Sequence, residues 1–139
     1  MKRTANAHWN GNLKDGNGEI SSQSTTLNQT PYSFKTRFDS GIGTNPEELI
    51  AAAHAGCFTM SVSAALQRLG FIANDLYTEA ILDVSMTDLK ITSIHLDLKA
   101  SLIAGVSAGA FQEIAEESKA NCIVSKALNV PITLNVSYQ

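Results

Sequence analysis

The chain has 139 residues, of which 44% are apolar and 17% charged, and its formal net charge is −3. This composition excludes a disordered chain and suits one globular domain over residues 1–139. The ten Lys and Arg residues are scattered and form no basic stripe, so no nucleic-acid partner is expected. The N-terminus lacks the apolar segment of a secretory signal, which predicts a cytoplasmic protein whose cysteines are reduced.

Short strands are predicted in the first third of the chain. Residues 5–9 and 20–27 flank a glycine-rich turn at residues 10–19, which indicates a hairpin. Residues 32–38 alternate between the two faces in the manner of a half-buried strand, so a third strand is expected there.

A long helix is predicted over residues 45–69. Asn45 is a favourable N-cap, Pro46 fits the first helical position and Gly70 supplies a stop. Nineteen residues after the first turn carry no formal charge, which is long enough to raise the question of a membrane span. Because many of them are alanine, serine or threonine, the segment is too weakly apolar for lipid. A central helix buried on most sides by protein is expected, with no membrane partner.

The second half of the chain predicts two strands, a helix and a final strand. Residues 80–86 alternate, and an apolar face runs from Ile94 to Leu102, as in half-buried antiparallel strands. Ser107 is a good N-cap for a helix over residues 107–120, and residues 132–138 alternate again. Strands, a long helix, strands, a helix and a strand together indicate the α+β class.

Two cysteines, Cys57 and Cys122, are either inert core thiols or a redox pair. Cys57 lies mid-helix, where the helix dipole no longer acts and burial raises the pKa of a thiol. A reactive Cys57 therefore requires a cation from elsewhere, and Arg37 is the best candidate. The alternative is that Arg37 is an ordinary exposed strand arginine, which composition alone favours. Whether Cys122 meets Cys57 depends on the fold, because 65 residues separate them in the chain.

Glu47 could orient Arg37 through a bidentate ion pair, or simply stabilise the start of the helix. Glu47 and Cys57 are ten residues apart on one predicted helix, about 15 Å along its axis. If both serve one site, a second subunit must contribute one of them. His54, three residues before Cys57, permits a Cys–His nucleophile pair but is more often a hydrogen-bonded core residue. The cysteines and histidines lack the ligand spacing of a zinc site, so no metal is expected.

Taken together, these residues resemble the OsmC/Ohr family, the osmotically inducible protein C and organic hydroperoxide resistance proteins. The resemblance covers essentially the whole chain and is closer to the OsmC branch. Its motifs are AHWNGN at residues 7–12, LNQTPYSFKTRF at 27–38, GTNPEELIAAAHAGCF at 43–58, and Cys122 with Val124 and Ser125.

The resemblance implies a thiol-dependent peroxidase that reduces organic hydroperoxides in preference to hydrogen peroxide, as a defence against oxidative or osmotic stress. Cys57 would be the peroxidatic cysteine and Cys122 the resolving one, while Arg37 would hold the thiolate and Glu47 would fix Arg37. The implied fold has strongly curved antiparallel sheets around two central helices in an intertwined homodimer. No metal or other cofactor is implied. The disulfide would be reduced by a dithiol, lipoylated protein being the reductant typical of the Ohr branch.

One position departs from the family pattern. The family usually has proline after the resolving cysteine, and this chain has Ile123, which leaves the backbone φ free and adds an N–H. The approach of Cys122 to Cys57 is therefore expected to be slower or differently aligned. Two alternatives stay open: a non-catalytic binding or stress protein with core cysteines, and a single-cysteine enzyme, either a peroxidase regenerated by external thiols or a hydrolase using Cys57 and His54.

Overall fold

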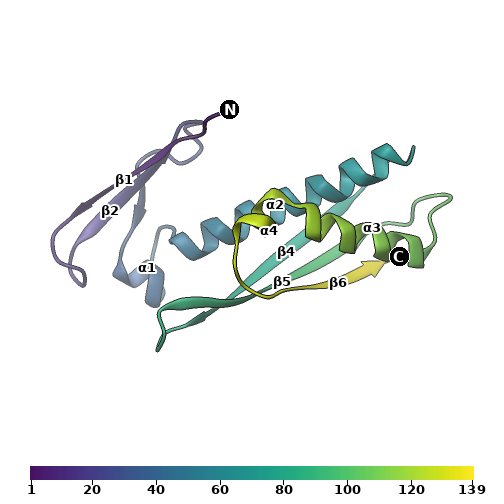
Figure 1. Ribbon diagram of the computed structural model, residues 1–139. Helices are drawn as coiled ribbons and strands as arrows, with labels where there is room; N and C mark the ends of the chain where they lie inside the picture. The colour runs from purple at the N-terminus through teal and green to yellow at the C-terminus, as the bar shows by residue number, and fades with distance from the viewer. The chain divides into compact units, whose positions relative to one another are not determined.

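The computed structural model describes all 139 residues, which form two compact units, residues 1–49 and 50–139. Figure 1 follows the chain through six strands and four helices. The single domain expected over residues 1–139 stays a prediction.

The first unit contains a three-stranded antiparallel sheet in the order β1-β2-β3. Its strands are β1 (Ala5–Asn10), β2 (Asn17–Ser22) and β3 (Thr30–Tyr32). The predicted hairpin is confirmed, with Asn10 opposite Asn17 at its closed end. The second strand ends five residues earlier than expected, at Ser22.

The third strand predicted over residues 32–38 is wrong beyond Tyr32, because α1 (Phe34–Phe38) is a short helix. Ser33 is its N-cap and forms a capping box with Thr36: the Thr36 N–H donates to the Ser33 hydroxyl oxygen at 3.2 Å, and the Ser33 N–H donates to the Thr36 hydroxyl oxygen at 2.8 Å. This local hydrogen bonding outweighs the strand-like alternation. Arg37 consequently lies in the last turn of a helix and not in a strand.

The long helix is confirmed as α2 (Pro46–Arg68). At its start the Glu48 N–H donates to the Asn45 side chain at 2.9 Å. At its end Gly70 has a φ of +84° and, with Phe71, donates to carbonyls of the last turn in a Schellman motif. Both boundaries therefore follow from capping residues that the sequence displays.

The second unit is built on a three-stranded sheet in the order β4-β5-β6. Its strands are β4 (Leu76–Ser85), β5 (Lys90–Ala100) and β6 (Ile132–Tyr138). β4 and β5 are antiparallel as expected, but β6 is parallel to β5, so the sheet is mixed and the expectation of purely antiparallel sheets is wrong. Alternation along a strand fixes which side chains share a face, and it carries no information about strand direction.

Two apolar residues at the strand ends are not in the core. A register shift between Asp83 and Val84 interrupts the alternation of β4 and leaves Val84 exposed. Leu102 lies beyond the end of β5 and is 66% exposed, so its predicted place on the buried face is wrong. The buried face of β5 is formed by Ile94, Leu96, Leu98 and Ala100.

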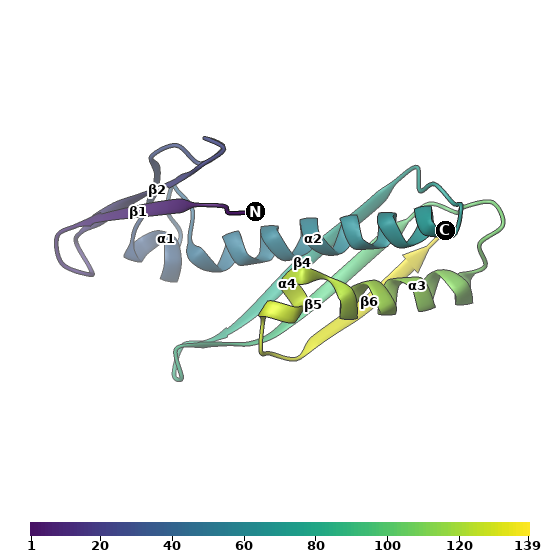
Figure 2. The same ribbon diagram turned by 45° about the horizontal axis from the view of Figure 1, so that its top comes forward.

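α3 (Ala108–Asn121) begins at the predicted N-cap Ser107, and the unpredicted helix α4 (Ile123–Ala127) follows it. In Figure 2, α2 and α3 lie on the same side of the β4-β5-β6 sheet. Both helices and β5 contribute to one apolar core, in which Phe58, Leu98 and Phe111 are fully buried. The α+β class predicted from the element order is confirmed.

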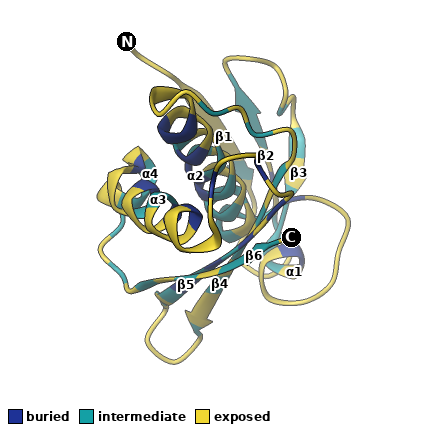
Figure 3. Ribbon diagram, turned by 90° about the vertical axis from the view of Figure 1, so that its right-hand side faces the viewer, coloured by how far each residue is buried: buried dark blue, intermediate teal, exposed yellow.

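The buried residues of α2 form one stripe along the helix, coloured dark blue in Figure 3. They are His54, Phe58, Val62, Ala65 and Leu66. This spacing is that of a helix packed on one side against a sheet. By length and composition α2 also resembles a membrane span. Of its most apolar stretch of 18 residues, 28% is buried within the protein. Within this chain, the expectation that α2 is buried on most sides is therefore wrong.

Candidate functional site

The two cysteines meet in the second unit. Cys57 comes from the start of the fourth turn of α2, and Cys122 links the end of α3 to the start of α4. Both are free thiols, and their sulfur atoms lie 2.7 Å apart in a thiol–thiol hydrogen bond. Cys122 is 1% exposed, while Cys57 is half-buried. The two sulfurs can therefore form a disulfide with little backbone movement, and the Cys57 sulfur is the more accessible of the two to a reactant.

The surroundings of the two sulfurs act on them in opposite directions. Burial, reinforced by the hydrogen bond with Cys122, raises the pKa of the Cys57 thiol. Burial also acts to raise the pKa of Cys122, but hydrogen bonds from Cys57 and from the backbone and hydroxyl of Ser125 outweigh it and lower that pKa. Within this unit the negative charge is therefore better stabilised on Cys122 than on Cys57. An active Cys57 thiolate needs an additional positive charge.

His54 does not pair with Cys57. Its imidazole is fully buried, and its Nε2 atom lies 2.8 Å from the hydroxyl oxygen of Ser125 on α4. The other ring nitrogen, Nδ1, has no hydrogen-bond partner. The Cys57–His54 nucleophile pair is thus absent, and His54 is linked instead to the residue three positions after Cys122.

Arg37 and Glu47 form a bidentate ion pair in the first unit. The Arg37 Nε donates to both Glu47 carboxylate oxygens, at 3.0 and 3.2 Å, and Nη2 donates to Oε1 at 2.7 Å. The arginine side chain is 45% exposed and the glutamate side chain 20% exposed. The guanidinium carbon also lies 5.2 Å from the centre of the Phe38 ring. The pair orients a cation that remains accessible to solvent.

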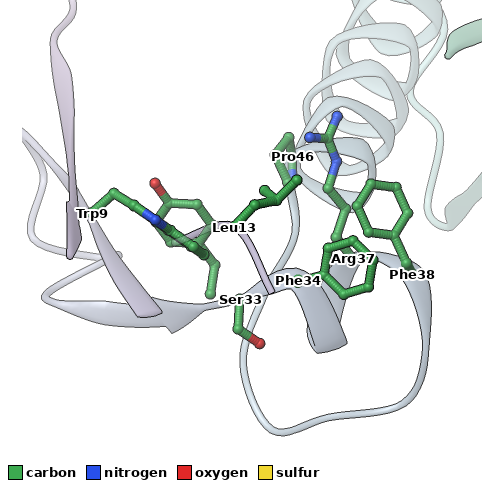
Figure 4. A pocket seen from close by; sticks show the side chains of 8 residues that line it. Trp9, Leu13, Ser33, Phe34, Arg37, Phe38 and Pro46 are labelled. Carbon is green, nitrogen blue, oxygen red and sulfur yellow. The ribbon is translucent and has the colours of Figure 1, made fainter. Parts of the chain in front are cut away.

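A pocket of about 270 Å³ adjoins this arginine (Figure 4). It is open to solvent, and the residues that line it are mostly aromatic or aliphatic, with Arg37 as their charged member. They are Trp9, Leu13, Tyr32, Ser33, Phe34, Arg37, Phe38 and Pro46. Such a pocket suits a small apolar group placed beside a cation.

Sequence reasoning singled out four residues, and the structure arranges them as two pairs. Cys57 lies with Cys122 in the second unit, and Arg37 lies with Glu47 in the first. The sequence marks Ser125 only as part of the motif around Cys122, whereas the structure gives it a place in the thiol site, beside His54 and close to Cys122. The signal in the sequence is a hydroxyl residue three positions after the second cysteine. No three His, Cys, Asp or Glu side chains lie together as metal ligands do.

Residues 38–137 match the family model described as OsmC-like protein. The chain is 41% identical over 136 residues to "Peroxiredoxin OsmC" of Escherichia coli (strain K12), with 97% of this chain and 95% of the relative covered. It is similar to the crystal structure of an organic hydroperoxide resistance protein OsmC from Legionella pneumophila, at 23% identity and a TM-score of 0.74, over 99% of this chain and 97% of the other. It is also similar to the crystal structure of an OsmC-like protein from Mycoplasma pneumoniae, at 16% identity and a TM-score of 0.78, over 99% and 97%.

The two structural similarities concern the fold, which agrees with the α+β architecture described above. The family match and the identity to the Escherichia coli protein extend the agreement to sequence, over nearly the whole chain. Both comparisons include the two cysteines. The chain belongs to the OsmC-like protein family.

Proposed function

We propose that this protein is a thiol-dependent peroxidase that reduces organic hydroperoxides, and hydrogen peroxide less well. The observation that carries the proposal is the 2.7 Å approach of Cys57 to Cys122, one thiol half-buried and the other fully enclosed. Relatives of this chain include a peroxiredoxin and an organic hydroperoxide resistance protein, and both agree with this chemistry.

In the first half of the reaction, the Cys57 thiolate attacks one peroxide oxygen. A sulfur–oxygen bond forms, the oxygen–oxygen bond breaks, and the leaving alkoxide takes up a proton to become an alcohol. The Cys57 sulfur is oxidised to a sulfenic acid while the peroxide is reduced. In the second half, Cys122 attacks the Cys57 sulfur, forming a disulfide and releasing water. A dithiol then exchanges with the disulfide and restores both thiols.

Arg37 is the proposed source of the positive charge that Cys57 lacks. A guanidinium beside the sulfur lowers the pKa of the thiol and then stabilises the negative charge that develops on the leaving oxygen. Glu47 holds Arg37 through its bidentate contact. The glutamate is thus a positioning residue, and the arginine a catalytic one.

The apolar pocket beside Arg37 supports an organic substrate. Aromatic side chains such as Trp9, Phe34 and Phe38 line it. An alkyl or aryl group that enters loses water contact, which is worth about 25 cal/mol per Å² of apolar surface buried. Hydrogen peroxide has no apolar group and gains nothing from this pocket. The selectivity for organic hydroperoxides follows from that difference.

The proposed assembly is an intertwined homodimer with its two active sites at the subunit interface. Met60 of α2 is 75% exposed and Ile72, just beyond the helix, is 78% exposed, although the helix carries no charge over five turns. Apolar surface of this extent is typical of an interface. The ten-residue separation of Glu47 and Cys57 along one helix also favours a site completed by a second copy. Met60→Glu should yield monomers in light scattering, whereas Met60→Leu should remain dimeric; a wild-type monomer would refute the assembly.

The proposed cellular setting is the cytoplasm, where reduced dithiols are available to close the cycle. A lipoylated protein is one such dithiol. Thiol–disulfide exchange begins with attack on an accessible sulfur, and in this disulfide the partly accessible sulfur is that of Cys57. The role is defence against hydroperoxides under oxidative or osmotic stress.

The function is tested by following the consumption of an alkyl hydroperoxide in the presence of a dithiol, with hydrogen peroxide in parallel. Wild-type protein should turn over the alkyl hydroperoxide faster than hydrogen peroxide, and Cys57→Ser should abolish both activities. Turnover that survives Cys57→Ser, or no turnover by the wild type, would refute the proposal. Loss of activity in His54→Gln with retention in Cys122→Ser would instead favour a single-cysteine enzyme.

A further inference from the structure

The feature that the proposed mechanism leaves unused is the buried imidazole of His54. Its side chain is 0% exposed and makes a single hydrogen bond, from Nε2 to the Ser125 hydroxyl, between segments 71 residues apart. Enclosing a polar ring with one nitrogen unpartnered costs free energy that a leucine of similar volume would avoid. The single hydrogen bond of His54, to Ser125, is therefore the feature that distinguishes it from an apolar core residue.

The burial and the unpartnered nitrogen fix which way this hydrogen bond points. Burial lowers the pKa of His54, so the ring is neutral near pH 7 and carries one N–H. If that proton were on Nδ1, a buried donor would have no acceptor. With the proton on Nε2, the ring donates to the Ser125 oxygen and leaves Nδ1 only an unused lone pair. His54 is therefore the donor to Ser125.

Ser125 then has its own hydrogen free for another acceptor. A hydroxyl that accepts from one neighbour donates to a second, and each hydrogen bond polarises the next. Ser125 lies in the first turn of α4, three residues after Cys122 at the N-cap of that helix, and its hydroxyl favours the ionised form of the Cys122 thiol, which lowers the pKa of that thiol. The titratable group in direct contact with the Cys122 sulfur is Cys57. A neutral sulfenic acid on Cys57 carries no negative charge, so it does not oppose the ionisation of Cys122.

We propose that His54 and Ser125 form a hydrogen-bonded relay, from imidazole N–H to hydroxyl to sulfur, that stabilises the Cys122 thiolate and prepares it to close the disulfide. The inference rests on the proposed function, in which Cys122 resolves the Cys57 sulfenic acid. In that step a sulfur–sulfur bond forms, the sulfur–oxygen bond of Cys57 breaks, and the leaving hydroxide combines with the proton of the Cys122 thiol as water. The Cys122 sulfur is oxidised and the Cys57 sulfur is reduced. His54 and Ser125 are positioning residues, because neither touches the peroxide.

The first test needs no peroxide. In a Cys57→Ser background Cys122 is the single thiol, and its ionisation can be followed by the ultraviolet absorbance of the thiolate. Ser125→Ala should raise the pKa of Cys122 by about one to two units, the loss of one hydrogen bond to a charged group. Ser125→Thr keeps the hydroxyl and should leave that pKa near its starting value. An unchanged pKa in Ser125→Ala would overturn the relay.

Substitutions of His54 separate hydrogen bonding from packing. His54→Gln places an amide N–H where the imidazole Nε2 lies and should keep the low pKa of Cys122, whereas His54→Leu should raise it. Equal pKa values in the two variants would overturn the part assigned to His54. Thr59→Val is the matched control, because it removes another hydroxyl through which α2 contacts a neighbouring element, the β4 residue Thr78 at 2.7 Å. It should leave the pKa of Cys122 unchanged.

The second test follows the two steps of one turnover in protein that retains both cysteines. Ser125→Ala should form the Cys57 sulfenic acid at the wild-type rate, detected with a sulfenic-acid trap, and should then form the disulfide about tenfold more slowly at neutral pH. Slowing of both steps alike would indicate a structural defect and overturn the relay. If the wild type forms neither product, the proposed function fails, and the thiolate titration still decides the relay.

Discussion

Removing the contact between Glu47 and Arg37 should lower the rate of Cys57 oxidation strongly and the free energy of unfolding only slightly. Glu47→Gln keeps the size of the side chain but removes the charge that holds the guanidinium through three short contacts. The arginine side chain is 45% exposed, so without the carboxylate it has room to adopt other rotamers. We therefore expect Glu47→Gln to lower the rate of Cys57 oxidation.

The size of the loss follows from the side-chain entropy that the glutamate removes. An arginine carries about 2 kcal/mol of rotamer entropy, and about 1.4 kcal/mol corresponds to a tenfold change. Freeing Arg37 completely would thus lower the fraction of correctly oriented protein by about thirtyfold, and a tenfold to thirtyfold loss of rate is expected. The same pair adds no more than about 1 kcal/mol to stability, because it is partly exposed and screened by solvent.

The assay is rapid mixing of reduced protein with an alkyl hydroperoxide, together with thermal unfolding of each variant. Glu48→Gln is the matched control, because that carboxylate lies in the same helical turn but bonds to Thr44 and Asn45. It should lower stability slightly and leave the rate of oxidation unchanged. Equal losses of rate in the two variants, or no loss in Glu47→Gln, would refute the positioning of Arg37 by Glu47.

Three further predictions concern the thiol site and the core beneath it. Cys122→Ser should accumulate the Cys57 sulfenic acid after one equivalent of hydroperoxide, and a mass spectrum without the added oxygen would contradict the assignment of roles. Ile123→Pro should preserve the fold, since proline is tolerated at the first position of α4. It should raise the pKa of Cys57 in a thiolate titration, because the backbone N–H of Ile123 helps to lower that pKa; an unchanged pKa would exclude this contribution. Phe58→Ala should cost about 3–5 kcal/mol in the free energy of unfolding, because the ring is fully buried, and a loss below about 1 kcal/mol in denaturant titration would contradict its place in the core.

The elements that the sequence predicts well are those with strong local signals. Asn45 and Gly70 bound the long helix, and Ser107 starts the second, because capping is decided by the residue and its immediate neighbours. Local chemistry also explains the failure at residues 32–38. There the Ser33 capping box selects a helical turn that alternation alone does not indicate.

The features that escaped prediction depend on contacts between distant segments. The parallel pairing of β6 with β5 requires the tertiary fold. The meeting of Cys57 with Cys122 requires it too, and only the family resemblance implied that pairing, not the spacing of the residues. The helix α4 has five residues, too few for a helical period to be recognised. Its residue Ser125 gains significance only when the fold brings it to a buried histidine.

The central claim is that Cys57 and Cys122 form a redox pair, and the most direct measurement is a thiol count on reduced protein after one equivalent of an organic hydroperoxide. We expect both thiols to be lost together, a Cys57–Cys122 disulfide to appear in peptide mass spectrometry, and a dithiol to restore both. Loss of one thiol would show that Cys122 does not resolve the sulfenic acid. Retention of both thiols would contradict the account and return the two cysteines to a purely structural role in the core.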